Sequence, residues 1–200
     1  MLWADEIIVA DSHSTDGTSE IAEKMGAKVI HIPFEGYGHL RNKAISYCTN
    51  EWIFSLDSDE RCTLEVKNEI LSIINTSSID IFKVPRKNFF MGKWIKHSGW
   101  YPNYRQPQLF RNGKMYYTDE EVHEGFVSHS EKKIGKLKNH IWQFPFKNTE
   151  EIIYKANRYS SLGALKLQKN GVKGSIFKAF THGFWSFTKH YIFKLGFLDG

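Results

Sequence analysis

Residues 52–60 read Trp-Ile-Phe-Ser-Leu-Asp-Ser-Asp-Glu, an apolar run that ends abruptly in two aspartates and a glutamate. Buried strands do not tolerate unpaired carboxylates, so these acids are expected at the carboxyl end of a strand. α/β proteins hold their ligands at such ends. Because Mg²⁺ commonly binds one or two carboxylates together with substrate phosphates, Asp57 and Asp59 indicate a metal-bridged diphosphate. A solvated turn after a strand gives the same letters, so the motif needs support from elsewhere.

The residues upstream supply that support through a regular alternation of patterns. Apolar runs predict four strands, and capped amphipathic segments predict three helices between them. This alternation predicts an α/β fold with a mostly parallel sheet flanked by helices, in which Asp11 and Asp57 both follow strands and converge on one crevice. The expected strands are 5–10, 27–31, the run ending at 57, and 80–84; the helices are 18–25 with Thr15 or Asp16 as cap, 36–48, and 63–74 with Thr63 as cap.

Six segments together resemble family 2 inverting glycosyltransferases, closest to the bacterial branch that adds glucose or similar sugars to the lipopolysaccharide core. They cover nearly the whole chain and are ADEIIVADSHSTDGTSEIA (4–22), GYGHLRNKAI (36–45), EWIFSLDSDER (51–61), RQPQLFRNGK (105–114), EEVHEGF (120–126) and YIFKLGFLDG (191–200). Family members begin with a further strand and helix before the first of these segments, and they continue past the last. The resemblance therefore implies a GT-A (Rossmann-like) fold in a chain that is a fragment at both ends.

The resemblance also implies roles for individual residues. Asp59 is expected to hold Mg²⁺ or Mn²⁺, which bridges the diphosphate of a nucleotide-sugar donor, expected to be a UDP-sugar. Asp57 is expected to contact the ribose or assist the metal, while Asp11 and Arg41 touch the nucleotide. Some relatives use a histidine after the base as a third metal ligand, and His140 is the candidate here, although a packed or exposed histidine gives the same letter.

The expected general base lies in residues 119–125, which read Asp-Glu-Glu-Val-His-Glu-Gly. An inverting transfer needs one carboxylate that accepts the proton of the acceptor hydroxyl as it attacks the anomeric carbon. Glu124 matches the family position for that role. The neighbouring acids Asp119, Glu120 and Glu121 are rivals, and His123 is expected to orient the loop or the phosphate.

The composition is that of a globular protein, with 41% hydrophobic and 24% charged residues in a chain of 200. The net charge of +5 is dispersed, which suits an anionic lipid or phosphorylated substrate. The sequence shows no zinc spacing and no aromatic RNA-binding signature, so a nucleic-acid partner is not expected. Only two cysteines are present, Cys48 and Cys62, which favours a reducing compartment over a disulfide framework.

Aromatic and polar residues alternate in the middle of the chain, at 88–95 and 97–102. Such residues stack on sugar faces, although ordinary loop packing uses them equally well. By the resemblance, residues 85–142 hold the acceptor side. Gln108 to Arg111 alternate like a short strand, and Arg111 is expected either to contact phosphate or to lie at the surface as an ordinary cation.

The last fifty residues predict a helical, amphipathic appendage. Phe177, Phe180, Phe184, Phe187 and Tyr191 recur at steps of three or four, which places them on one helix face. Charges interrupt every apolar stretch, so the segment is not expected to span a bilayer but to lie in its interface. Packing against the rest of the protein or a partner is the alternative. The expected domains are 1–142, for nucleotide sugar and acceptor, and 149–200, a membrane-interfacial tail, with a linker at 143–148.

The sequence therefore predicts a hexosyltransferase that acts with inversion on a lipid-linked or lipopolysaccharide-core saccharide. Its expected location is cytoplasmic, peripheral on the inner face of the bacterial plasma membrane. Two alternatives stay open at this point: a nucleotidyltransferase of similar fold, which releases pyrophosphate, and an inactive fragment that only docks to membrane or a partner.

Overall fold

The computed structural model describes residues 3–118 and 125–199. The chain forms two compact units that interleave along the sequence. The first unit contains Met1–Asp57, Cys62–Val84 and Tyr104–Asn139, and the second contains Ser58–Arg61, Pro85–Asn103 and His140–Gly200.

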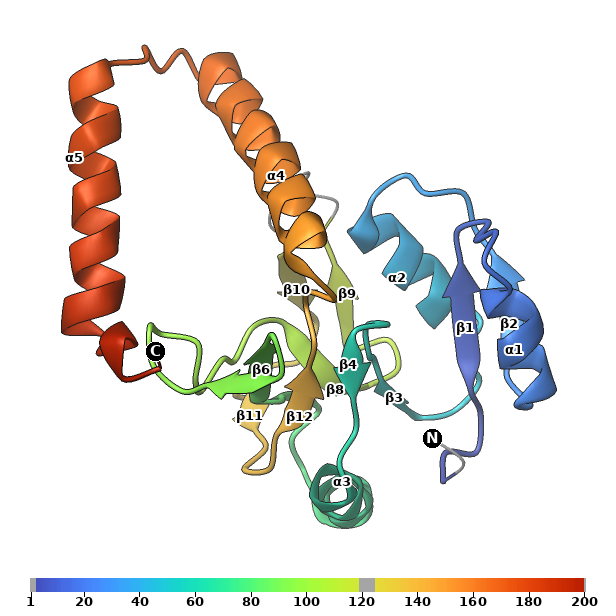
Figure 1. Cartoon of the computed structure of the whole chain (residues 1–200). Coiled ribbons are helices and arrows are strands. Elements are labelled where there is room, and N and C mark those ends of the chain that lie inside the picture. The colour runs from blue at the N-terminus through green and yellow to red at the C-terminus, as the bar shows by residue number, and fades with distance from the viewer. Residues whose placement is uncertain (1–2, 119–124, 200) are drawn as a thin grey trace. The chain divides into compact units, whose positions relative to one another are not determined.

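The first unit begins with a β-α-β segment. Strand β1 (Ile8–Asp11) pairs in parallel with β2 (Lys28–His31), and α1 (Thr18–Lys24) connects them (Figure 1). The cap of α1 differs from the prediction by one or two positions. Gly17 occupies it with a φ of 79°, a left-handed conformation that glycine adopts without strain. The carboxylate of Asp16 accepts hydrogen bonds from Thr18 just beyond.

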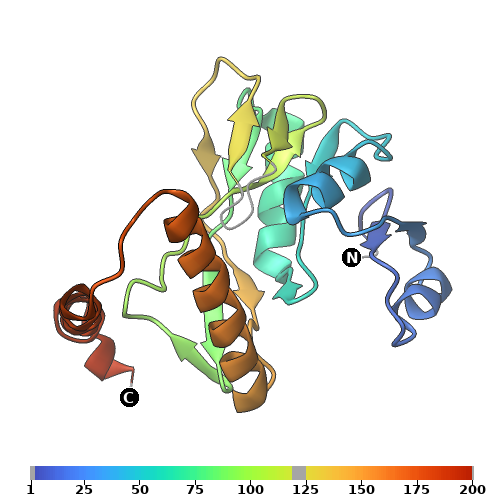
Figure 2. The ribbon, with the colours of Figure 1, turned by 90° about the horizontal axis from the view of Figure 1, so that it is seen from above.

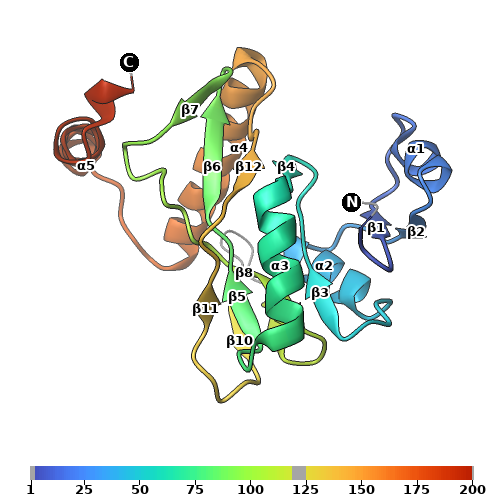
Figure 3. The same cartoon turned by 90° about the horizontal axis from the view of Figure 1, so that it is seen from below.

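The rest of the first unit is built around a four-stranded sheet whose order is β11-β5-β8-β3 (Figure 3). Strand β8 runs antiparallel to both of its neighbours, whereas β11 is parallel to β5. The core of this unit contains Ile53, Ile81 and Phe110 from these strands. The strands are β3 (Trp52–Phe54), β5 (Ile81–Lys83), β8 (Pro107–Arg111) and β11 (Gly135–Lys136).

Two helices and a hairpin complete the first unit. Helix α3 (Leu64–Thr76) is capped by Thr63 as predicted, because the Thr63 hydroxyl accepts a hydrogen bond of 3.3 Å from the amide of Val66. Helix α2 (Tyr37–Ile45) begins after Gly36, whose φ is 132°. Strands β9 (Met115–Tyr117) and β10 (Phe126–Ser128) pair antiparallel, and β9 adds Met115 and Tyr117 to the core.

The second unit has its own four-stranded sheet in the order β4-β12-β6-β7. The central strands β12 and β6 are parallel, and the two edge strands are antiparallel to them. The strands are β4 (Glu60–Arg61), β6 (Arg86–Phe90), β7 (Lys93–Ile95) and β12 (Ile141–Gln143).

The helical tail of the second unit follows the sheet. It contains α4 (Thr149–Lys169), α5 (Ile176–Phe187), a π-helical turn (Thr188–Phe193) and a final 3₁₀ turn (Gly196–Leu198). Asn148 caps α4 by accepting a hydrogen bond of 2.8 Å from the amide of Glu151. In Figure 2 α5 is seen nearly end-on while α4 is seen from the side, so the two helices are not parallel.

The predicted α/β class and the helices after residue 149 are confirmed. The pairing of strands is mixed, however, because antiparallel β8 lies between β5 and β3 where consecutive parallel strands were expected. A sheet in which an antiparallel strand joins parallel ones is common among α/β folds. The division into 1–142 and 149–200 stays a prediction.

Candidate functional site

Two residues predicted from separate motifs to bind the nucleotide contact each other directly. Arg41, on α2, donates a hydrogen bond of 2.6 Å from Nη2 to Oδ1 of Asp57, which lies just beyond the end of β3. The guanidinium of Arg41 also lies 5.1 Å from the centre of the Tyr117 ring. Both members of the pair are partly exposed, at 21% and 38%. The pair therefore presents a cation and an anion together at the open end of a strand.

The neighbouring residue, Asn42, holds Arg41 in this position. Its side-chain amide donates to the carbonyl of Tyr117 at 2.8 Å and accepts from the amide of the same residue at 2.9 Å. This two-way contact attaches α2 to β9 across 75 positions of sequence. Sequence reasoning gave Asn42 no role, since nothing in the local pattern indicates a partner so far along the chain.

Asp11 is at the carboxyl end of β1, as predicted, but its carboxylate is committed to the loop that follows. Ser14 donates from both its amide and its hydroxyl, and the Ser19 hydroxyl donates at 3.0 Å. Nδ1 of His31, on β2, lies 3.4 Å away. The hydrogen bond from the Ser14 side chain is the main reason that the pKa of Asp11 is lowered, although burial opposes it. Asp11 thus shapes the loop 12–17 and contacts the first turn of α1 through Ser19.

Two histidines that the sequence reasoning missed lie beside Asp11. The rings of His13 and His31 stack with centres 5.8 Å apart and planes 13° from parallel. His13 has a φ of 62°, an unusual conformation for a residue with a side chain. The signal was present as a histidine three positions after the first expected strand and another at the last position of the second.

Asp59, the predicted metal ligand, belongs to the second unit. Its Oδ2 accepts a hydrogen bond of 3.2 Å from Gln143, and its carbonyl accepts one of 2.8 Å from the amide of Phe144. Glu60, the next residue, forms a buried ion pair with Arg86. Asp59 is therefore held at the end of β4 by contacts on its backbone and side chain.

His140, the other predicted metal ligand, is half-buried, and its ring lies 6.3 Å from that of Tyr101 in an edge-on arrangement. Within residues 3–118 and 125–199, no group of three His, Cys, Asp or Glu side chains is arranged to hold a metal ion. Asp57 and Asp59 each carry a carboxylate, the type of ligand that hard divalent cations take together with substrate phosphates and water, and their roles toward a metal stay predictions. A role for His140 stays a prediction.

Glu124 and its rivals Asp119, Glu120 and Glu121, together with His123, lie outside the described residues. The positions on either side are described. Thr118 donates its amide to the carbonyl of Gly125 at 3.1 Å, and the Gly125 amide donates to the Thr118 hydroxyl at 2.8 Å. A Cβ added to Gly125 would lie 2.9 Å from that hydroxyl. Thr118 and Gly125, on either side of residues 119–124, are thus joined by two hydrogen bonds, and the close approach of the Thr118 hydroxyl favours glycine at position 125.

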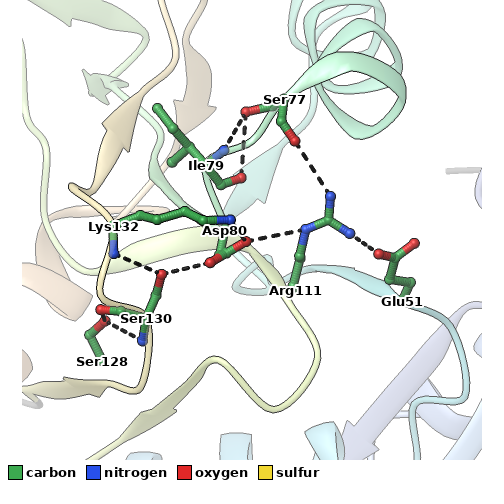
Figure 4. Close-up of polar contacts among 8 residues, drawn as sticks. All are labelled: Glu51, Ser77, Ile79, Asp80, Arg111, Ser128, Ser130 and Lys132. Atoms are coloured by element: carbon green, nitrogen blue, oxygen red, sulfur yellow. Dashed lines mark hydrogen bonds and ion pairs between the residues drawn. The ribbon is translucent and has the colours of Figure 1, made fainter.

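Arg111, which was expected either to contact phosphate or to lie at the surface, belongs to an ion-pair network (Figure 4). Its guanidinium contacts Glu51, lies 3.4 Å from Oδ1 of Asp80, and stacks over the ring of Trp52 at 4.5 Å. Asp80 is 5% exposed and also accepts from Ser130 and Lys132 (Figure 4). These contacts give Arg111 a structural role in the first unit.

Comparisons with known proteins agree on one family. The model of the family described as glycosyl transferase family 2 matches residues 4–130. An uncharacterized glycosyltransferase of Rickettsia felis is 31% identical over 213 aligned residues, which cover 98% of this chain and 72% of the relative. The lipopolysaccharide core biosynthesis glycosyltransferase LpsC of Rhizobium meliloti is 28% identical over 186 residues, or 86% of this chain and 66% of LpsC. The matched range contains Asp11, Arg41, Asp57 and Asp59.

Proposed function

The chain belongs to glycosyl transferase family 2 and is thus a transferase, and we propose that it moves a sugar from a UDP-sugar to a saccharide or lipid-linked acceptor with inversion. The contact between Arg41 and Asp57 carries this proposal. In this contact a guanidinium, which suits a phosphate, lies beside a carboxylate, which suits a ribose or a metal, just beyond the end of a strand. The relative named for lipopolysaccharide core biosynthesis supports a lipopolysaccharide-core saccharide as the acceptor.

The donor side of the mechanism follows from the chemistry of these side chains. Mg²⁺ or Mn²⁺ held by Asp59 would supply Lewis-acid stabilisation of the departing diphosphate. Arg41 shares its charge with Asp57 and binds a phosphate oxygen when the donor arrives. Asp57 orients the ribose or the metal, and Asp11 keeps the loop 12–17 in the shape that receives the nucleotide.

On the acceptor side, Glu124 accepts the proton of the attacking hydroxyl. A carboxylate is required because the proton must leave as the new bond forms on the face opposite the leaving group. Glu124→Gln keeps the size of the side chain but removes its basicity, so turnover is expected to fall about 10²–10⁴-fold while donor affinity survives. Glu121→Gln is the matched control, and loss of turnover in that variant alone would move the role to Glu121.

The tail is proposed to hold the protein at the inner face of the plasma membrane, with the catalytic residues in the cytoplasm. Among the residues that the structure describes, no helix is long and apolar enough to cross a bilayer. The aromatic face of α5 is open, since Phe177, Phe180 and Phe184 are 77%, 75% and 73% exposed. Residues 152–198 contain eight Lys and Arg and no Asp or Glu. Such a segment combines the apolar and the cationic parts of an interfacial helix.

The donor half of this proposal is tested by calorimetric titration of UDP into the protein with Mg²⁺ or Mn²⁺ and again with excess chelator. Metal-dependent binding that Asp59→Ala removes and Glu150→Ala retains supports it, because Glu150 is an exposed acid in the first turn of α4 with no place in the donor chemistry. UDP binding that is equal in the chelator, or equal in Asp59→Ala, contradicts it.

A further inference from the structure

The sheet of the second unit buries several polar side chains on one face, beside the fully buried Ile141. A sheet with one solvated face normally turns apolar residues inward and polar residues outward. Here Glu60, Arg86, Asn88 and Gln143, which all point to one face, are at most 9% exposed. Burial of such groups is costly unless they are paired, so the polar interior is specified by particular contacts.

The opposite face of this sheet carries large aromatic side chains. The register pairs Trp142 with Arg61 and Lys87, and it pairs Phe89 with Trp94, which places all five on that face. Phe144 continues β12 by two positions from Trp142 and stacks on Phe89, with ring centres 4.9 Å apart. Trp142 is 43% exposed and Phe144 is 38% exposed. Phe89, Trp94, Trp142 and Phe144 together form the aromatic face of this sheet.

Cations stand among these rings. Nζ of Lys87 lies 4.2 Å from the centre of the Trp94 ring, and Nζ of Lys96 lies 4.7 Å from the same centre. Arg61 is exposed next to Trp142. None of the strand residues that the register places on this face is acidic. The second unit as a whole contains fourteen Lys and Arg against five Asp and Glu, so the net charge of the chain comes from this unit. Such a face is suited to an anionic ligand.

The aromatic face also begins directly beside the candidate metal ligand. The amide of Phe144 donates to the carbonyl of Asp59 at 2.8 Å, so the ring and the carboxylate belong to paired positions of two neighbouring chain segments. A molecule that lies on Phe144 and Trp142 therefore lies near the backbone of Asp59, whose carboxylate accepts a hydrogen bond from Gln143 on the other face of the sheet.

We propose that the aromatic face binds the acceptor as a saccharide that carries phosphate or carboxylate groups. The C–H face of a sugar ring packs on an aromatic ring, and the lysines beside the rings meet the anionic groups. That the bound saccharide is the acceptor rests on the proposed function; that this face binds an anionic saccharide does not. It names a site on the four-stranded sheet of the second unit and a charge for the acceptor.

The test is calorimetric titration with a phosphate-bearing lipopolysaccharide core oligosaccharide freed of its lipid, and with the same oligosaccharide after dephosphorylation. Trp142→Ala combined with Phe144→Ala is expected to weaken binding at least about tenfold, as truncation of aromatic anchors does at other interfaces. Tyr116→Ala, at a ring in the first unit that is 42% exposed, is the matched control and keeps the affinity. The dephosphorylated form binds more weakly than the phosphorylated form, and salt narrows the difference.

A second variant, Lys87→Gln with Lys96→Gln, leaves the rings in place and is expected to lose the preference for the phosphorylated form. Undiminished binding by both double variants overturns the proposal. The proposal is also overturned if single-stranded oligothymidylate or phosphatidylglycerol vesicles bind more tightly than the oligosaccharide and both double variants weaken that binding. Metal-dependent UDP binding is measured in the same samples. If it fails in every form while oligosaccharide binding follows the aromatic face, the proposed function is wrong and the anionic-saccharide site stands.

Discussion

Nε of Arg86 lies 2.5 Å from Oε1 of Glu60, and the two side chains are 5% and 0% exposed. Glu60 follows Asp59 in the chain, so this buried ion pair fixes the residue next to the candidate metal ligand. Arg86 also opens β6, which is the strand that carries Lys87 and Phe89. The pair thus connects the end of the acidic motif to the middle of the sheet.

Removal of one partner of this pair is expected to destabilise the protein strongly. Arg86→Met leaves the carboxylate of Glu60 buried without its counter-ion, which typically costs about 3–5 kcal/mol. The double variant Arg86→Met with Glu60→Leu removes both charges of the pair and is expected to recover most of that loss. Urea unfolding followed by circular dichroism measures both. Equal destabilisation of the single and the double variant would show that the charges are not coupled.

Arg41 is expected to control nucleotide affinity. Arg41→Ala removes the cation beside Asp57 and should weaken UDP binding by about ten- to a hundredfold, as loss of a charge-assisted hydrogen bond does. Asn42→Ala, which loosens α2 from β9, should produce a smaller decrease because the guanidinium remains. Lys43→Ala changes an exposed cation on the same helix and serves as the control. Equal effects of Arg41→Ala and Lys43→Ala in a UDP titration would reduce the role of Arg41 to general charge.

The network around Asp80 should appear in the pH dependence of stability. The hydrogen bond from Ser130 is the largest cause that lowers the pKa of Asp80 below its ordinary value of 3.8, and Lys132 adds to it. A carboxyl whose folded pKa is lowered stabilises the native state fully above its unfolded pKa, and this stability is lost as pH falls through the folded pKa. Unfolding free energy of the wild type should therefore fall on acidification below about pH 4.

Asp80→Asn cannot titrate at this position. Its unfolding free energy should therefore decrease less on acidification than that of the wild type, although the variant is less stable at pH 7. Urea unfolding at pH 7 and at pH 3 gives the comparison. Asp5→Asn, at an exposed acid in the same unit, should follow the wild-type curve. An equal decrease in unfolding free energy from pH 7 to pH 3 in the wild type and in Asp80→Asn would contradict a lowered pKa of Asp80 as the cause.

Membrane binding should depend on the exposed phenylalanine side chains of α5. Phe180→Ser with Phe184→Ser is expected to abolish flotation with phosphatidylglycerol liposomes at low salt, since about 1.5–3 kcal/mol is lost for each large apolar side chain that no longer enters the membrane. Ile153→Ser, at a 65% exposed position of α4, is the comparison and should still float. The lysines of residues 173–194 contribute about 1 kcal/mol each, so added salt should weaken flotation. Flotation of the double phenylalanine variant at the wild-type level would leave α5 as a packing surface.

The features that the sequence predicted are those with local causes. Thr63 caps α3 because a threonine before an amphipathic run satisfies the free amides of the first turn. Asp11 and Asp57 follow strands because acids end apolar runs. Arg41 was assigned to the nucleotide through the family resemblance alone; the structure shows its hydrogen bond to Asp57, and the role toward the nucleotide stays a prediction.

The features that escaped prediction depend on partners far apart in sequence. Glu60 and Arg86 are 26 positions apart, and Asp59 and Gln143 are 84 apart. Each of these contacts follows from the register of strands, which local patterns do not fix when polar residues are buried. The aromatic face was hidden for the same reason: Trp142 and Phe89 become neighbours only when β12 pairs with β6. The position of β8 between β5 and β3, antiparallel to both, likewise cannot be predicted from the local sequence pattern.

The most direct test of sugar transfer is proton NMR of the reaction between a UDP-sugar and a lipopolysaccharide core oligosaccharide with Mn²⁺ present. The wild type is expected to release UDP and to form a new glycosidic bond whose anomeric configuration is opposite to that of the donor. Asp59→Ala, and the wild type in excess chelator, are expected to form no product, because the diphosphate then departs without a metal. Release of pyrophosphate in place of UDP, or transfer by Asp59→Ala at the wild-type rate in chelator, would contradict the account.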